Sequence, residues 1–170
     1  MHRLAMRRYF SVLNFVAVVA AVAATAHAQL PATRIYSVFP QGAQAGTAVD
    51  VTITNGVDLA ELDQLVFSHP GFKAAHKTAN TFTVTVDAGV PPGIYEARAH
   101  GLYGTSNPRS FVVGTLPEIN EDNNNATMEL AKPVEVGSIV NGKSDAGADV
   151  DFYKITAKKG QRLLVECTSL

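Results

Sequence analysis

The stretch Thr47–Thr54, which reads TAVDVTIT, alternates apolar and polar side chains. Val49, Val51 and Ile53 would lie on one side of an extended strand, with the polar residues between them on the other side. A helix would need apolar residues three and four positions apart. The pattern therefore predicts a half-buried β-strand, and the Asn55-Gly56 pair that follows is typical of a turn.

The same alternation recurs along residues 30–114. Residues 81–86 place Phe82, Val84 and Val86 on one face. Shorter strands are expected at 34–39, 64–68, 93–99 and 110–113, separated by Pro- and Gly-rich turn signals, and residues 58–65 alone have the pattern of a helical turn. Six or seven short strands at a spacing of roughly ten residues predict a β-sandwich, so the fold class is all-β.

The overall composition fits a globular protein. The chain has 170 residues, of which 46% are apolar and 17% charged, so it has room for one medium domain or two small ones. It contains one Cys and no Trp, which excludes a disulfide framework and an antibody-type core. The sandwich core must rest on aliphatic, Phe and Tyr packing.

Residues 1–28 have the three parts of a secretory signal peptide. Arg3, Arg7 and Arg8 form a basic start, an apolar run follows, and Ala26-His27-Ala28 supplies the small residues of a cleavage site. We expect an N-terminal signal helix and cleavage before Gln29. An uncleaved anchor is the alternative, although the apolar run is shorter than the ~20 residues that a spanning helix needs. The expected location is therefore secreted, periplasmic or at the cell surface, with membrane contact only before cleavage.

Without the signal peptide, eleven basic side chains remain against fifteen acidic ones, a net charge of −4. This excess of acid argues against a nucleic-acid partner, because phosphate binding needs a basic face. The single Cys167 lies in the apolar run 163–167, which predicts a small buried side chain with no catalytic role.

The remaining residues have a different organisation. Residues 115–120 are expected to be a linker, and residues 121–125 read EDNNN, a loop-forming run. Strands are expected within 133–140, 151–157 and 161–167. Residues 121–170 are thus predicted to be a second β domain.

The order of several motifs in residues 34–114 resembles an immunoglobulin-like module of secreted bacterial proteins, of the IPT/TIG type. The motifs are Phe39-Pro40-Gln41-Gly42, Phe67-Ser68-His69-Pro70-Gly71, Pro91-Pro92-Gly93-Ile94-Tyr95 and the run from Ser106 to Gly114. The resemblance implies an immunoglobulin-like β-sandwich at 30–114.

The second part resembles the start of a bacterial pre-peptidase C-terminal domain. The matching pieces are Glu121-x-Asn123-Asn124, Gly137-Ser138-Ile139, the run Asp149 to Ile155, and Lys159-Gly160-Gln161. The resemblance implies a non-catalytic, partial jelly-roll-like β-sandwich at 121–170. Family modules are longer than this stretch, so we expect a truncated product or a fragment.

Oxygen-rich side chains in this second part predict a calcium site. Glu121, Asn123 and Asn124 supply three side chains within four positions, and Asp149 and Asp151 lie on the same side of a strand start. Calcium-binding relatives of the resembled family use similar places. A solvated polar loop beside an exposed Asp pair is the alternative.

No catalytic constellation is evident in the sequence. His69, His76 and His100 lack zinc-ligand spacing, and residues 104–108 carry Pro where a hydrolase nucleophile elbow needs Gly. Tyr95 and Tyr103 are candidates for a sugar platform, but core or cross-strand packing is the better interpretation of both.

Two functions follow from these observations. The first is an exported, non-catalytic interaction or spacer protein, calcium-stabilised if the predicted site is real, with an extracellular protein or polysaccharide as partner. The second is the N-terminal accessory region of a larger secreted enzyme, most plausibly a peptidase. A polysaccharide-binding module is a third hypothesis, which needs a flat aromatic face.

Overall fold

The computed structural model describes residues 30–169 except 123, 145, 146 and 148. The described part of the chain is all-β, as predicted, and contains no helix. The expected signal peptide and its helix lie outside the described residues. The strands of the first region are β1 (Arg34–Phe39), β2 (Gly42–Gln44), β3 (Ala48–Val57), β4 (Gln64–Phe67), β5 (Phe72–Thr78), β6 (Thr81–Val86), β7 (Gly93–Gly101), β8 (Gly104–Thr105) and β9 (Arg109–Gly114).

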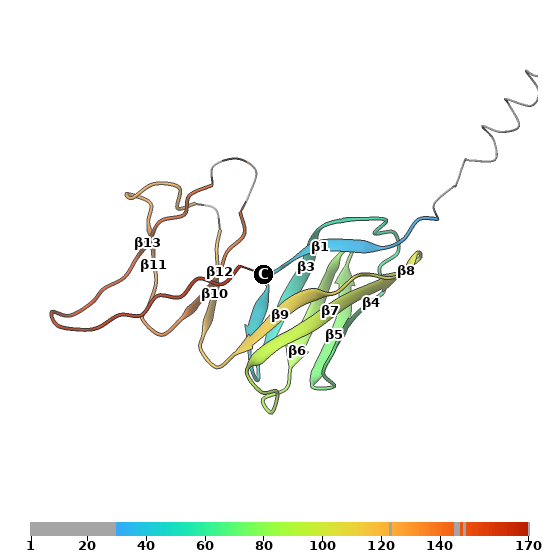
Figure 1. Ribbon diagram of the computed structural model, residues 1–170, viewed down its shortest axis with the longest axis horizontal. Helices are drawn as coiled ribbons and strands as arrows, with labels where there is room; N and C mark the ends of the chain where they lie inside the picture. The colour runs from blue at the N-terminus through green and yellow to red at the C-terminus, as the bar shows by residue number, and fades with distance from the viewer. Residues whose placement is uncertain (1–29, 123, 145–146, 148, 170) are drawn as a thin grey trace, which may run out of the picture. The chain divides into compact units, whose positions relative to one another are not determined.

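These strands form two sheets (Figure 1). One has the order β1-β3-β6-β5, and the other has the order β2-β9-β7-β4, with β8 paired to β7. All neighbours are antiparallel except β2 and β9, which run parallel. In chain order this is the ABED and GFC arrangement of an immunoglobulin-type sandwich, with a short extra strand beside the last one.

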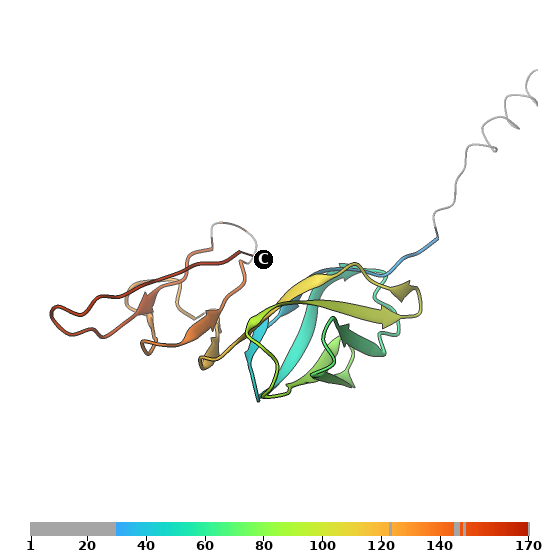
Figure 2. The same cartoon turned by 60° about the horizontal axis from the view of Figure 1, so that its bottom comes forward.

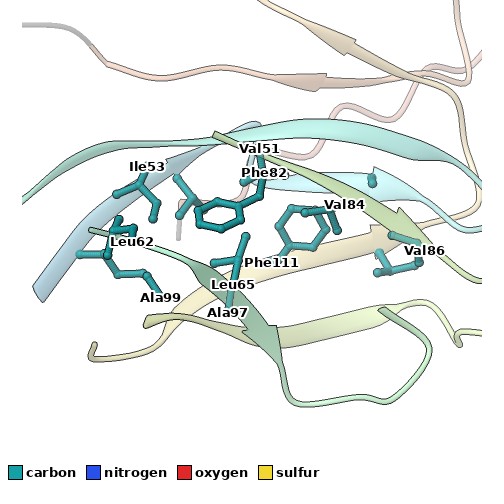
Figure 3. Packing of buried hydrophobic residues seen from close by; sticks show 14 of the residues in the cluster. Val51, Ile53, Leu62, Leu65, Phe82, Val84, Val86, Ala97, Ala99 and Phe111 are labelled. Carbon is teal, nitrogen blue, oxygen red and sulfur yellow. The ribbon is translucent and has the colours of Figure 1, made fainter. Parts of the chain in front are cut away.

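Alternating residues of both sheets fill the space between them (Figure 3). Phe82 from one sheet and Phe111 from the other are completely buried, and Val51, Val84 and Ala97 lie among them. The polar residues between these positions face outward, as the period of two requires. At roughly 25 cal/mol for each Å² of apolar surface removed from water, this core is the main source of stability.

Strand β1 contains an irregularity that the alternation does not predict. Ile35 and Val38 are both buried, although they are three positions apart. In the pairing with β3, Ile35 lies opposite Gly56 and Ser37 opposite Asn55, which leaves Tyr36 as the extra residue of a bulge. The bulge turns Tyr36 outward, where its side chain is 45% exposed.

Three local expectations differ from the structure. Strand β5 was not expected, because its sequence FKAAHKT is rich in Ala, Lys and His, which favour strands weakly. The short strand β2 was not expected either. Residues 58–63 form a bend and a turn instead of a helical turn, with positive φ at Asp58 and Glu61, and residues 64–65 belong to β4.

After residue 117 the described chain contains only short strands joined by long loops (Figure 2). β10 (Glu118–Asn120) pairs in parallel with β12 (Ile139–Asn141), and β11 (Lys132–Pro133) pairs in parallel with β13 (Tyr153–Lys154). The strand expected at 133–140 is divided by a turn, the one at 151–157 is two residues long, and the described residues of 161–167 form none.

The apolar residues near the C-terminus are not buried. Leu164 and Val165 are 82% and 77% exposed. Cys167 is also exposed, so the prediction of a buried cysteine was wrong. That prediction assumed a strand in this run, and without a strand no second layer covers the side chain.

Candidate functional site

Glu121 is the buried acid of the second region. It follows β10 directly, and its side chain is only 7% exposed. Its main-chain N–H donates to the Asn141 carbonyl at 3.0 Å, which holds it beside the end of β12. Its Oε1 accepts the Lys143 N–H at 2.7 Å, whereas Oε2 is buried without a hydrogen-bond partner. Gly142 leaves the space beside Oε2 open, because a Cβ at that position would lie 3.0 Å from the oxygen.

The carboxyl of Asp151 lies beside that of Glu121. Burial raises the pKa of Glu121, the Lys143 N–H opposes this rise, and the charge and hydrogen bonding of Asp151 add to it. Two ionised carboxylates have no proton to share and repel each other, so this arrangement favours either a proton or a cation between them.

Asn125 and Tyr153 extend the same polar cluster. The Asn125 side chain is 1% exposed; its Nδ2 donates to the Phe152 carbonyl at 3.2 Å, and its Oδ1 is buried without a partner. Burial raises the pKa of the Tyr153 phenol, the Asn125 side chain opposes the rise, and the charges of Asp151 and Glu121 add to it. The neutral amide oxygen of Asn125 and the phenol oxygen of Tyr153 therefore belong to the same cluster as the two carboxylates.

The structure brings together two of the five residues predicted to bind calcium, Glu121 and Asp151. Asn124 is exposed, and its main-chain N–H contacts Asp122 Oδ1 at 3.4 Å. Asp149 is exposed and has an interaction of its own, and Asn123 lies outside the described residues. Among the described residues, no three His, Cys, Asp or Glu side chains are placed to hold a metal ion together.

The sequence analysis missed Asn125 as a member of this cluster. Its position in the polar run EDNNN suggested a loop residue, and only its burial against the Phe152 main chain distinguishes it. A second half-buried acid, Glu118 at the start of β10, was also not singled out from the sequence. Burial raises the pKa of Glu118, and the Asn141 side chain, which donates to Glu118 Oε2 at 2.7 Å, opposes the rise.

His69, His76 and His100 take separate structural roles. His69 packs edge-on against Tyr95 with ring centroids 5.4 Å apart, and His76 packs against Phe82 at 5.2 Å. His100 lies 3.3 Å from Asp63. The half-buried ring of Tyr95 also contacts Phe72, and the Tyr95 hydroxyl donates to the Pro91 carbonyl at 2.7 Å. Tyr103 is 38% exposed.

A second polar feature lies on the sandwich itself. A hollow of about 70 Å³ separates β1 from the start of β9. Its lining comprises Tyr36, Ser37, Val38, Gln41, Pro108, Arg109 and Ser110. Residues that carry an aromatic ring, a guanidinium, an amide and hydroxyl groups therefore lie around one small space.

Comparison with known proteins reveals a similarity in structure. No family model matches the chain, and no curated protein matches it in sequence. The chain is similar to the solved structure of SGBP-B of the Bacteroides ovatus mixed-linkage glucan utilization locus in complex with a mixed-linkage heptasaccharide. The identity is 13% and the TM-score 0.36, over 64% of this chain and 27% of that one. The chain thus spans about a quarter of that structure's length.

Within the described residues, no helix is long and apolar enough to cross a membrane.

Proposed function

We propose that this chain is an exported, non-catalytic interaction protein whose second region is stabilised by Ca²⁺. In this proposal an immunoglobulin-like module at 30–114 presents the binding surface, and residues 115–120 link it to a pre-peptidase-type module that begins at residue 121. The partner is an extracellular protein or polysaccharide, and the location is secreted, periplasmic or at the cell surface.

The observation that carries the calcium part of the proposal is the unpartnered Oε2 of Glu121 beside the carboxyl of Asp151. Calcium prefers carboxylate, amide and carbonyl oxygens, and all three kinds are present around this pair. Glu121 and Asp151 would hold the ion, with Asn124 or neighbouring carbonyls completing its shell. A bound cation would supply the positive charge that the two carboxylates lack.

The second region has few other sources of stability. Its described strand pairs are two or three residues long, and several large apolar side chains remain exposed. An ion that joins the end of β10 to the residues before β13 would restrain the loops between them. This is why we assign calcium a structural role.

The calcium test is limited proteolysis of the purified chain in 5 mM EDTA and across a calcium titration on the order of 10⁻⁵ to 10⁻² M, the range of weak extracellular sites. Cleavage sites are mapped by mass spectrometry. We expect calcium to protect residues 118–169 while the sandwich resists proteolysis in both conditions. Glu121→Gln should abolish this protection, and the exposed Glu135→Gln should leave it intact. Identical cleavage of residues 118–169 with and without calcium would overturn the calcium assignment.

Export is tested separately, by fractionating cells that express the chain and sequencing its N-terminus. Release from the cytoplasm with Gln29 as the first residue is expected. Retention of the complete chain in the cytoplasm would exclude the exported role and would leave the calcium result unaffected.

A further inference from the structure

The hollow between β1 and β9 is lined by polar, charged and aromatic residues. It lies at the side of the sandwich where β1, the edge strand of one sheet, approaches β9 of the other. Among the described strands, none pairs with the outer edge of β1. Asn107 in the β8–β9 connection and Arg109 at the start of β9 bind the main chain of Ile35 there instead. The side chain of Arg109, which lines the hollow, is therefore held by a main-chain contact with β1.

Tyr36 forms an exposed aromatic wall of this hollow. The bulge in β1 turns its ring outward, and bulges commonly re-aim a side chain beside a functional site. Its side chain is 45% exposed, although it lies within a strand whose neighbours Ile35 and Val38 are buried. An exposed Tyr ring offers an apolar face on which a sugar ring can stack.

Arg109 supplies a positive charge at the hollow. Its Nε donates to the Ile35 carbonyl at 3.0 Å, which fixes the guanidinium at the rim of the hollow. In the described part of the chain, no carboxylate lies within ion-pair distance of Arg109, although Arg98, on the neighbouring strand, pairs with Glu96 at 3.0 Å. The remaining N–H groups of Arg109 present the fork that binds a carboxylate with two hydrogen bonds.

We propose that this hollow binds a uronate unit of an acidic polysaccharide. The sugar ring stacks on Tyr36, and its carboxylate enters the hollow and pairs with Arg109. A volume of about 70 Å³ holds a few water molecules, which suits a carboxylate but not a whole sugar ring. Gln41 and Ser110 supply donors and acceptors for the ring hydroxyls. The inference rests on the proposed role as an interaction protein and names the chemistry of its partner.

The net negative charge of the chain makes a binding test selective for a local cationic site. The chain without residues 1–28 has a net charge of −4, so unspecific attraction to a polyanion is disfavoured. Binding of an acidic polysaccharide would therefore require a local cationic site. The probe is a short galacturonate oligomer, and its fully methyl-esterified form is the matched control, because it keeps the sugar rings and removes the charge.

We expect calorimetry of the purified chain in EDTA to detect the galacturonate oligomer and to show roughly tenfold weaker binding of the ester. Arg109→Gln should weaken binding of the acid by about tenfold and bring its affinity close to that of the ester. Tyr36→Ala should weaken both ligands by about fivefold, whereas Tyr36→Phe should bind like the original chain. Circular dichroism and the melting temperature establish that each variant folds.

Two control variants test whether binding depends on this hollow or on any exposed arginine or aromatic ring of the chain. Arg34→Gln removes an exposed arginine outside the lining of the hollow, and Tyr103→Ala removes an exposed ring elsewhere. Both should keep the affinity. No binding of either oligomer, equal binding of the acid and the ester, or an equal loss in Arg34→Gln and Arg109→Gln would overturn the proposal. Because EDTA is present throughout, failure of this proposal is distinguishable from failure of the calcium assignment.

Discussion

Asn107 binds Ile35 through both the oxygen and the nitrogen of its side-chain amide. Its Oδ1 accepts the Ile35 N–H at 2.9 Å, and its Nδ2 donates to the Ile35 carbonyl at 2.9 Å. A neighbouring strand would make the same two bonds to a residue at a sheet edge. One side chain from the connection between β8 and β9 thus replaces a strand partner and joins the two sheets at β1.

This relationship predicts a loss of stability when the amide is removed. Ile35 is completely buried, so Asn107→Ala leaves its N–H without a partner in a place that water reaches poorly, and its carbonyl keeps only the hydrogen bond from Arg109 Nε. We expect the free energy of unfolding to fall by about 2–3 kcal/mol in urea denaturation. Asn55→Ala, which changes an exposed asparagine of β3, should shift it by less than about 0.5 kcal/mol. Equal effects of the two substitutions would contradict the assigned role of Asn107.

The sequence predicts the sandwich strands where alternation is strict and one face is buried. Residues 47–54 and 81–86 are such segments, and they form the long strand β3 and the central strand β6. Strand β5 was missed because it lies at a sheet edge, where a partner's hydrogen bonds determine the conformation and residue preference has little effect. The bulge at Tyr36 was missed for a related reason, since its extra residue is defined only by the pairing of β1 with β3.

The candidate calcium site was predicted only in part. Spacing indicated which acidic segments have suitable side chains, and the structure brings Glu121 and Asp151 together. Spacing does not show which residue of a polar run turns inward, so the burial of Asn125 was not predicted. The hollow beside Tyr36 and Arg109 combines residues from distant parts of the chain, and no local pattern in the sequence marks such a combination.

The buried ring of Phe111 predicts a large effect of truncation. It is completely buried and packs edge-on against Phe67 and Phe72, with ring centroids 5.3 and 6.1 Å away. Phe111→Ala removes this packing and leaves a cavity, so the free energy of unfolding should fall by about 3–5 kcal/mol. Tyr103→Ala, at an exposed ring, should cost less than about 1 kcal/mol in the same urea titration. A loss below about 1 kcal/mol for Phe111→Ala would be inconsistent with the described core.

The parallel pairing of β2 with β9 depends on a glycine. A Cβ at Gly42 would lie 2.7 Å from the Val112 carbonyl oxygen, which belongs to the main chain of the partner strand and has little room to move. Gly42→Ala should therefore separate the two strands and lower the melting temperature by several degrees, a shift that corresponds to about 1–2 kcal/mol. Gly89→Ala is the matched control, because a Cβ there meets nothing within 4 Å, and its melting temperature should stay the same or rise slightly. The same melting temperature for both variants would show that β2 does not pack closely on β9.

The Glu121 and Asp151 pair predicts a pH dependence of local stability. Burial raises the pKa of Glu121 in the folded chain, whereas the unfolded chain titrates near the ordinary value of about 4.3. Between these two values the folded state binds more protons than the unfolded state, so stability at this site falls as the pH rises from about 4.3 through the folded pKa. The local probe is the protection factor of the Lys143 amide, whose N–H donates to Glu121 Oε1, measured by hydrogen exchange in EDTA.

Glu121→Gln separates this effect from the titration of other acids. The amide oxygen of Gln can accept the Lys143 N–H, and its amide nitrogen can donate to Asp151, so neither group requires a proton or a cation. In EDTA at neutral pH the variant should therefore protect the Lys143 amide more strongly than the original chain, and its protection factor should not decline between pH 4 and 7. Adding calcium should raise protection in the original chain but not in Glu121→Gln. Glu135→Gln, at an exposed glutamate, should reproduce the original pH profile. If Glu121→Gln protects the Lys143 amide less than the original chain in EDTA, the two carboxylates do not repel each other in solution, and a cation between them has no electrostatic basis.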